Sequence, residues 1–360
     1  MIARLAMNPA SLVELGGAAD APADVFAQHS QLCAMLETHG LLVVGSHDEG
    51  QALVAAVVQI ERRSHEAGLI WRDLFKLLRN NRRVVPRRPA CSCSLQDVDS
   101  LATLRTQWKQ SADVIVLTDD QADRVGVKPT EVSRIDTTGL DLVPARRAFH
   151  AQTLQHLRDL RENGFVDNGT PRQRFWEQVL RPIATVSNEI VIYDRYLYGR
   201  LAQRRRDAPA SDAREPEHVV WLLEQLDGLS RATGLHVQLL GSFNSRPGSG
   251  EEGRAPTNGE DAGELVRNYW TPSGGGIAQL DVVAVNFTTS LPHARHLRSD
   301  IGVGITMEAG WDRFSRSNIT ESGGVEWAYR WKSQPIKKFR DAEQRVMRDA
   351  SVRTTTIHPA

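Results

Sequence analysis

The sequence predicts an α/β protein made of two domains. Short apolar runs suited to buried strands alternate along the chain with segments of helical periodicity. At roughly 150 residues per domain, 360 residues are enough for two separate cores. A content of 41% hydrophobic and 24% charged residues is ordinary for a soluble globular protein.

The first part of the chain reads as a small α/β domain, residues 1–125, whose role the sequence does not reveal. The pattern predicts helices over 25–36, 51–60 and 70–78, and strands over 41–44 and 113–117. Residues 126–168 contain several Gly and Pro and little periodicity, which predicts a linker.

Two polar features of this first part have two interpretations each. A proline-interrupted basic segment is either a solvated connector or a nucleic-acid contact, and it contains Arg79, Arg82, Arg83, Arg87 and Arg88. The run from Thr118 to Asp123, directly after a strand, is either a helix N-cap or the edge of a metal or phosphate site.

The second part predicts a larger α/β domain over 169–345, followed by a tail over 346–360. Thr170 and Pro171 open a helix that continues through Leu180, and a further helix is expected over 217–232. Strands are expected over 189–193, 235–240 and 280–287, and alternating aromatic residues predict a packed strand around 327–331.

Charge and cysteine content exclude several classes of protein. The 44 basic and 44 acidic residues balance, which speaks against a globally basic nucleic-acid coat. Six of the basic residues are Lys, which leaves 38 Arg, a bias that reflects either codon usage or phosphate recognition. The three cysteines have no disulfide or zinc-finger spacing, so neither a disulfide scaffold nor a zinc site is supported. No cofactor is expected for the favoured function. No signal peptide or membrane span is apparent, and a cytoplasmic location fits best.

One short segment carries a pattern suited to phosphodiester chemistry. His293, Arg295 and Asp300 lie at positions i, i+2 and i+7. In an extended segment the first two share a face, so an imidazole would lie beside a fixed cation. The imidazole can attack or protonate a phosphate ester while the guanidinium neutralises its oxygens. Asp300 is expected to orient the imidazole, whereas His296 is expected on the surface.

The spacing of this segment resembles the His-x-Lys-x-x-x-x-Asp motif of the phospholipase D superfamily, with Arg295 in place of Lys. The longer run HARHLRSDIGVGITMEAGWDRF, residues 293–314, is similar to the C-terminal phospholipase D-like domain of MIT-domain proteins of cytokinesis. The resemblance covers roughly residues 170–330 and includes IVIYDRYLYGRL upstream. It departs from the superfamily at 307–310, where Met-Glu-Ala-Gly replaces Gly-Ser-x-Asn. It implies a mixed sheet flanked by helices, with substrate-binding roles for Asp194, Tyr196 and Arg298, which match the family's motifs. Ser242 is also expected to bind substrate, because it follows a strand where a ligand-facing loop would lie.

The resemblance implies a metal-independent phosphodiesterase, most plausibly a nuclease in antiviral or mobile-element defence. Phospholipase D chemistry uses two His residues, so a single motif implies a homodimer. The alternative is a non-catalytic adaptor that binds phosphate groups of nucleic acid or of a phospholipid head group, with the N-terminal domain binding a partner protein. A third interpretation is a PIN-like metal nuclease in residues 1–120, using Asp48, Glu49, Asp119 or Asp120.

Overall fold

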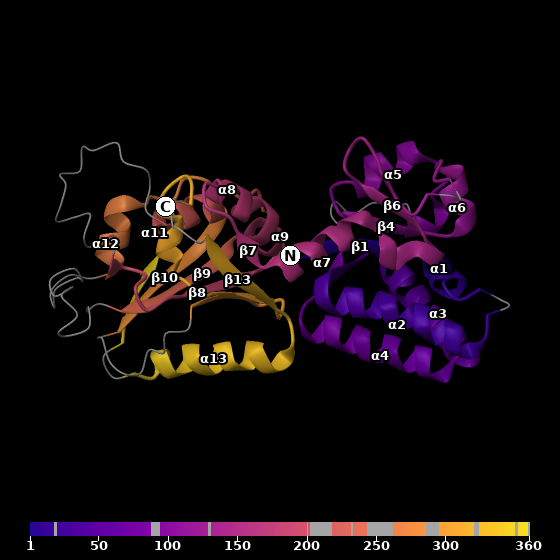
Figure 1. Cartoon of the computed structure of the whole chain (residues 1–360), viewed down its shortest axis with the longest axis horizontal. Coiled ribbons are helices and arrows are strands. Elements are labelled where there is room, and N and C mark those ends of the chain that lie inside the picture. Colours follow the sequence, from indigo (N-terminus) through magenta and orange to yellow (C-terminus); the bar gives the residue numbers. More distant parts are fainter. Residues whose placement is uncertain are drawn as a thin grey trace. The chain divides into compact units, whose positions relative to one another are not determined.

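The computed structural model describes residues 1–17, 20–87, 94–128, 131–199, 201, 218–231, 233–242, 262–285, 295–319, 324–349 and 352–358. The chain forms two compact units, Met1–Glu162 and Asn163–Ala360, each with its own sheet (Figure 1). Helices flank both sheets, which confirms the α/β class predicted from the sequence.

The first unit is built on a six-stranded sheet with the order β3-β2-β1-β4-β6-β5. Its strands are β1 (Ala3–Met7), β2 (Gly40–Val44), β3 (Val84–Pro86), β4 (Val114–Leu117), β5 (Arg134–Ile135) and β6 (Asp141–Pro144). All neighbours pair in parallel except the antiparallel edge strand β5. Parallel strands require crossover connections, so helices must cover the faces of this sheet.

The helices of the first unit lie on both faces of its sheet, with α2 and α4 on one side and α5 and α6 on the other (Figure 1). They are α1 (Pro9–Glu14), α2 (Pro22–His39), α3 (His47–Arg63), α4 (His65–Asn80), α5 (Leu101–Trp108), α6 (Asp119–Arg124) and α7 (Gln152–Asn163), with 3₁₀ turns η1 (Leu95–Asp97) and η2 (Ala145–His150). The three helices predicted before residue 125 are confirmed as α2, α3 and α4. Thr118 caps α6 in a capping box with Gln121, in agreement with the helix N-cap interpretation of this run.

The second unit is built on an eight-stranded mixed sheet with the order β14-β10-β9-β8-β11-β12-β13-β7. Its strands are β7 (Phe165–Val166), β8 (Glu189–Tyr193), β9 (Leu235–Ser242), β10 (Ile277–Val285), β11 (His296–Ser299), β12 (Gly304–Met307), β13 (Val325–Arg330) and β14 (Arg353–Ile357). The central strands β8, β9 and β10 are parallel, and antiparallel strands extend the sheet on both sides.

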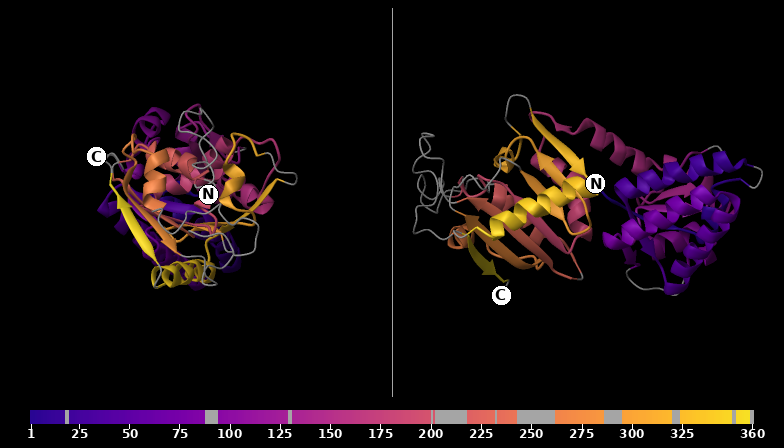
Figure 2. Two further views of the ribbon diagram at one scale, coloured as in Figure 1. Left: turned by 90° about the vertical axis from the view of Figure 1, so that its left-hand side faces the viewer. Right: turned by 90° about the horizontal axis from the view of Figure 1, so that it is seen from below.

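Helices also cover both faces of the second sheet, and the long helix α13 runs alone across one of them in the views of Figure 2. The helical segments are α8 (Arg172–Phe175), the π-helical turn η3 (Trp176–Leu180), α9 (Arg181–Val186), α11 (His218–Asp227), α12 (Ala262–Tyr269), the 3₁₀ turn η4 (Trp311–Phe314) and α13 (Ser333–Met347). Val346 of α13 packs on a buried apolar cluster from the central strands, with Tyr193, Leu240 and Val283 among its members.

The structure corrects two expected boundaries. Residues 126–168 are not a linker, because β5, β6, η2 and α7 belong to the first unit and β7 pairs with β13 in the second. Residues 346–360 are not a tail either, because β14 adds an antiparallel strand to β10. In both segments the strands are short and are recognised from their partners in the sheets.

Within the described part of the chain, every helix is too short or too polar to cross a lipid bilayer.

Candidate functional site

Most of the site residues predicted from the sequence for the second unit lie where the central parallel strands of the second sheet end. The parallel strands β8 and β9 both end here, at Tyr193 and Ser242. Strand β11 runs antiparallel to β8 with His296 opposite Tyr193, so it begins where β8 ends. We call this region, formed by Asp194, Arg195, Tyr196, Ser242 and Arg295, the Arg295 edge. The carboxyl ends of parallel strands are where open α/β sheets commonly bind ligands.

Asp194 is the buried carboxylate of the Arg295 edge, with 1% of its surface exposed. Its Oδ1 accepts the backbone N–H of Tyr196 at 2.9 Å, and its Oδ2 accepts that of Trp311 at 3.0 Å. Burial raises the pKa of Asp194, since the surrounding protein solvates the carboxylate less well than water does. The two N–H donors and the Arg295 cation oppose this rise, and Asp312 adds to it.

Arg295 lies beside Asp194 but is not saturated by it. Its Nη1 donates to the carbonyl oxygen of Glu308 at 2.5 Å, whereas its Nε lies 3.8 Å from Asp194 Oδ1, beyond hydrogen-bond distance. Among the described residues, no acceptor satisfies this Nε. The side chain is 20% exposed. The unsatisfied Nε is itself buried, so an anion would reach the guanidinium through its exposed part, and the planar fork suits a phosphate group.

Three further residues complete the Arg295 edge. The Arg195 guanidinium lies 5.9 Å from the ring centroid of the half-buried Tyr196, within the range of a cation–π contact. Ser242 is buried, and its backbone N–H donates to the carbonyl oxygen of Arg195 at 3.3 Å. The structure thus brings Asp194, Tyr196 and Ser242, three of the four residues expected to bind substrate, to one edge together with Arg295, which was expected to act in catalysis.

The catalytic pattern read from the sequence is not assembled as expected. His293 lies outside the described residues. Asp300 lies at the far end of β11, where its Oδ1 accepts the backbone N–H groups of Asn188 and Glu189 at 2.9 and 3.3 Å. Asp300 is five positions along the chain from Arg295, on the far side of strand β11, about 16 Å at roughly 3.3 Å per residue. Asp300 anchors the start of β8 and does not lie beside Arg295.

His296 and Arg298 belong to the opposite side of β11, under α13. The expectation of a surface position for His296 is wrong: the ring is fully buried between Tyr193 and Phe339, with centroids 4.8 and 4.3 Å away. Its Nε2 lies 3.0 Å from Glu343 Oε1. Arg298 binds Glu343 through Nε at 2.8 Å and Glu189 through Nη2 at 3.0 Å.

The Glu343 contacts correct the expected substrate-binding role of Arg298. Both of its carboxylate partners belong to this unit, and its side chain is only 9% exposed. Burial works against ionisation of Glu343, yet hydrogen bonds from His296 and Arg298 lower its pKa overall. Arg298 therefore ties α13 to the sheet rather than facing the Arg295 edge.

The acidic residues of the first unit do not assemble the metal site of the third interpretation. Glu49 is buried and accepts from Gly45 N, Ser94 Oγ and Leu95 N, so it holds loops together. Asp48 is exposed, and Asp119 Oδ2 lies 3.5 Å from Arg146 Nε. In the described ranges, no three His, Cys, Asp or Glu side chains are grouped so that they could hold a metal ion.

The basic segment after α4 is largely structural. Arg83 is fully buried and donates through Nη1 to the carbonyl oxygen of Glu37 at 2.6 Å. Arg87 is 2% exposed, and its guanidinium lies 4.4 Å from the ring centroid of Trp108. These two arginines stabilise the first unit, and Arg88 lies outside the described residues.

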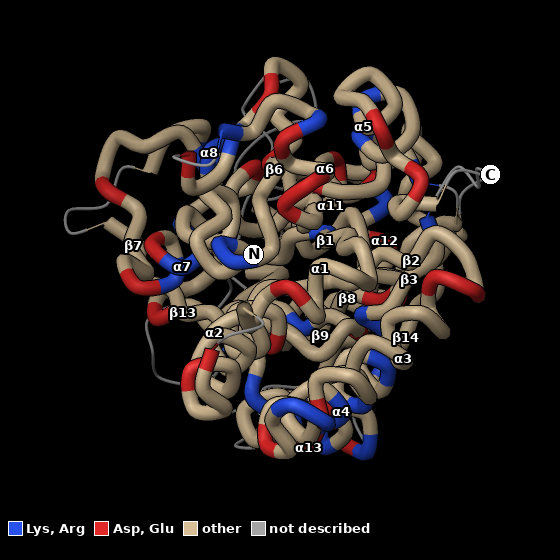
Figure 3. Tube along the Cα trace, turned by 90° about the vertical axis from the view of Figure 1, so that its right-hand side faces the viewer, with Lys and Arg blue, Asp and Glu red and all other residues tan. Residues whose placement is uncertain are grey.

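The sequence analysis missed one feature that bears on function. The outward face of α13 is basic, since Lys337, Lys338, Arg340 and Arg345 are exposed and Asp341 is the exposed acidic residue among them. Figure 3 marks where Lys, Arg, Asp and Glu occur along the chain trace. Four basic residues within nine positions of an amphipathic helix were the available signal.

Comparison of the chain with protein-family models and with curated proteins finds no match. The chemistry open to the chain is therefore inferred from the geometry of the Arg295 edge and from the residues around it.

Proposed function

We propose that the second unit binds phosphodiester groups of a nucleic acid at the Arg295 edge. The observation that carries this proposal is the unsaturated Arg295 guanidinium, partly exposed at the carboxyl end of the parallel strands. Arg195 supplies a second cation at the same edge, beside the aromatic ring of Tyr196. An aromatic ring next to two cations is suited to a base and its phosphate.

The charge of α13 favours nucleic acid over a single lipid head group. Its exposed Lys337, Lys338, Arg340 and Arg345 provide further positive charge on the same unit. A polyanion gains from several such contacts because each neutralised phosphate releases counterions. A phospholipid head group would use the Arg295 edge alone.

The chemical step proposed for this site is metal-independent hydrolysis by His293. This residue is separated from Arg295 by a single residue in the sequence. One imidazole would attack the phosphorus and form a P–N bond as the P–O ester bond breaks, and the leaving oxygen would take a proton from a second imidazole. Water would then hydrolyse the P–N bond and return a proton to the second imidazole, while Arg295 stabilises the charge on the phosphate oxygens. Two such imidazoles are required, one as nucleophile and one as acid for the leaving group, so the active form would be a homodimer.

The position of Asp300 favours a second candidate function, a non-catalytic phosphate-binding adaptor. Asp300 bonds to the backbone at the other end of β11, so the carboxylate expected to orient His293 is engaged elsewhere. In this case the first unit would carry the partner-binding role.

Binding is tested by fluorescence anisotropy with a labelled 20-nucleotide single strand and the full-length protein. Arg295→Ala should weaken binding at least tenfold, since a charge-assisted bidentate contact is lost. Arg330→Ala, at an exposed arginine on β13, is the matched control and should change the affinity less than twofold. Equal affinities for wild type and Arg295→Ala would overturn the proposal.

Catalysis is tested separately by incubating the oligonucleotide with the protein in EDTA. Hydrolysis that His293→Ala abolishes supports the nuclease. Salt-sensitive binding that survives His293→Ala, without hydrolysis, supports the adaptor. Preferential binding to phosphatidylinositol-phosphate vesicles would contradict the choice of nucleic acid.

A further inference from the structure

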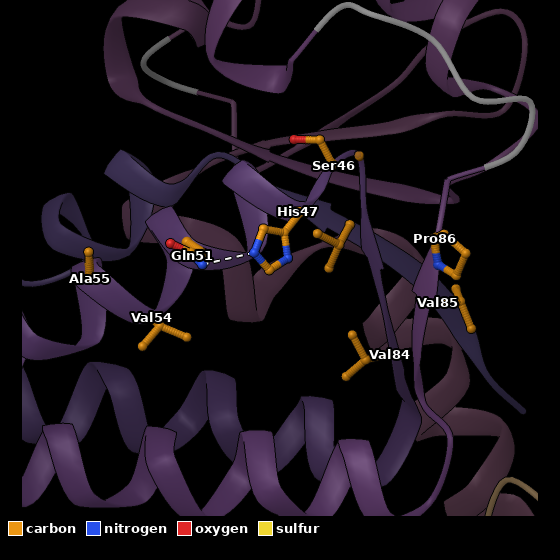
Figure 4. Close-up of a pocket in the computed structure, with 11 residues that line it drawn as sticks. Ser46, His47, Gln51, Val54, Ala55, Val84, Val85 and Pro86 are labelled. Carbon is orange, nitrogen blue, oxygen red and sulfur yellow. Dashed lines mark hydrogen bonds between the residues drawn. The ribbon is translucent and has the colours of Figure 1, made fainter.

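The first unit contains a pocket that the proposed function does not use. It has a volume of about 770 Å³ and lies between α3 and the edge strand β3, at the carboxyl end of β2 (Figure 4). This size falls within the range of small-molecule sites, about 300–1,000 Å³. Most of its lining is apolar or glycine, and the polar side chains are Ser46, His47 and Gln51.

The two walls of the pocket are unusually apolar for exposed surface. Val54 of α3 is 56% exposed and Val84 of β3 is 38% exposed, and they face the same space from opposite sides (Figure 4). The other face of α3 already packs in the core through Leu53, Val57 and Ile60. A surface helix normally presents a single apolar stripe, which packs on the core. The second apolar face of α3 is exposed to water, and a ligand that covered it would bury apolar surface.

Gly50 keeps this pocket open at a cost to the helix. A glycine inside a helix destabilises it by roughly 0.5–1 kcal/mol relative to alanine. At Gly50 an added Cβ would meet one atom, Val44 Cγ1, at an ordinary 3.5 Å. The contrast is Gly68 in α4, where an added Cβ would lie 2.4 Å from Glu61 Cβ. Close packing thus requires Gly68 but not Gly50, whose missing side chain leaves room in the pocket.

The polar end of the pocket is formed by His47 and Gln51. Gln51 Nε2 lies 2.8 Å from His47 Nε2, and an amide nitrogen only donates, so this imidazole nitrogen accepts. The other ring nitrogen then carries the proton, and it is directed away from Gln51 (Figure 4). Among the described residues that line the pocket there is no Lys, Arg, Asp or Glu, so these side chains offer no charge to complement a charged ligand.

We propose that this pocket binds an uncharged, planar ring compound whose hydrogen-bonding edge contacts His47. The apolar body of the ring lies between the α3 wall and the β3 wall. The ring covers Val54 and Val84, and the proton of His47 meets an acceptor atom on the ring edge. A ring of the size of benzimidazole, which carries both an N–H and an acceptor nitrogen, has this chemistry.

The experiment uses the full-length protein and two bicyclic probes of the same size. Benzimidazole carries the hydrogen-bonding edge and indane lacks it. Binding is followed by protein-observed NMR at pH 7.5. Wild type should bind benzimidazole saturably and at least threefold more tightly than indane. His47→Ala should remove this preference while it retains indane binding.

Two variants that close the pocket complete the test. Gly50→Leu fills it from within and should reduce the affinity for both probes at least tenfold, with a melting temperature equal to or above that of wild type. Val54→Trp, at an exposed position, should block the opening of the pocket and reduce the affinity for both probes to the same extent. This variant replaces Gly50→Leu in the test if Gly50→Leu does not fold. Absence of saturable binding to wild type, or affinities unchanged in a folded pocket-closing variant, would overturn the proposal. A preference for benzimidazole that persists in His47→Ala would overturn the role of His47.

Discussion

At the scale of single residues, the proposed phosphate binding depends on the Asp194–Arg295 pair. Asp194 is held by two backbone N–H groups, so it stays in place whether or not a ligand is present. It lies 3.8 Å from Arg295 Nε without bonding to it. A phosphate bound as proposed at Arg295 would therefore meet a negative charge close by, and Asp194 would limit the affinity of the edge for anions.

Asp194→Asn should tighten oligonucleotide binding about three- to tenfold, because it removes this negative charge but keeps an acceptor. Wild-type binding should also weaken as pH rises through the raised pKa of Asp194, since the protonated carboxyl competes less for Arg295. The variant should lose this pH dependence. Anisotropy titrations at several pH values check both effects. Asp167→Asn, at an exposed acid of the second unit, is the control. Weaker or unchanged binding by Asp194→Asn would contradict the competition.

At the scale of elements, α13 has two separate tasks. Its inner face packs Phe339 on His296 and places Glu343 between His296 and Arg298. Its outer face carries the basic residues proposed to contact nucleic acid. The helical period of 3.6 residues separates these faces, so the two tasks can be changed independently.

Glu343→Gln should destabilise the second unit by about 2–4 kcal/mol, because breaking a buried ion pair leaves Arg298 only partly compensated. Urea unfolding followed by circular dichroism measures the loss. Gln344→Glu, an exposed neighbour on the same helix, should leave the free energy of unfolding within about 0.5 kcal/mol. Equal stability of Glu343→Gln and wild type would show that the contacts of Glu343 with His296 and Arg298 make no net contribution to the free energy of unfolding.

On the outer face, replacing both Lys338 and Arg345 with Gln should change how salt affects binding. Each phosphate contact to a single strand contributes about 0.7 to the slope of log affinity against log salt concentration. The double variant should therefore reduce the magnitude of that slope by about 1.4 if both residues contact phosphates. Anisotropy titrations over a range of NaCl concentrations measure it. A slope equal to that of wild type would exclude α13 from the interface.

At the scale of the whole molecule, the chain is two units that each complete their own sheet. The first unit ends at Glu162, and the strand β6 that lies beyond the expected domain boundary pairs along the full length of β4. Strand β14 likewise completes the second sheet near the end of the chain. Because each sheet takes strands from both ends of its unit, neither unit can be shortened to the domain read from the sequence.

A fragment of residues 1–162 should fold, whereas a fragment of residues 1–125 should not, because it lacks β6 and leaves the apolar strand β4 uncovered. Dispersed NMR amide spectra and a cooperative thermal transition identify a folded fragment. Cooperative folding of 1–125 would show that β5, β6 and α7 are dispensable.

The amino-acid pattern was sufficient for the fold class and for most of the helices and strands with a clear period. It correctly indicated α2 to α4, β2, β4 and β8 to β10, because one buried face or a buried run determines each of them. It missed β1, the strand between β2 and β4, because its apolar run is short and contains Arg4. Arg4 is tolerated there because it pairs with Asp113 at 2.7 Å, a residue more than one hundred positions away.

For the site, the spacing along β11 correctly separated His296 from the face of Arg295, but it could not show what covers each face. Helix α13, which follows some forty residues later, buries His296 and engages Arg298. Strand β11 separates the two residues, so Asp300 lies beside the start of β8 and Arg295 lies beside its end. Local periodicity fixes which side of its own element a residue occupies. Packing against distant segments decides whether that side meets solvent, a partner charge or a ligand, and that depended on the tertiary structure.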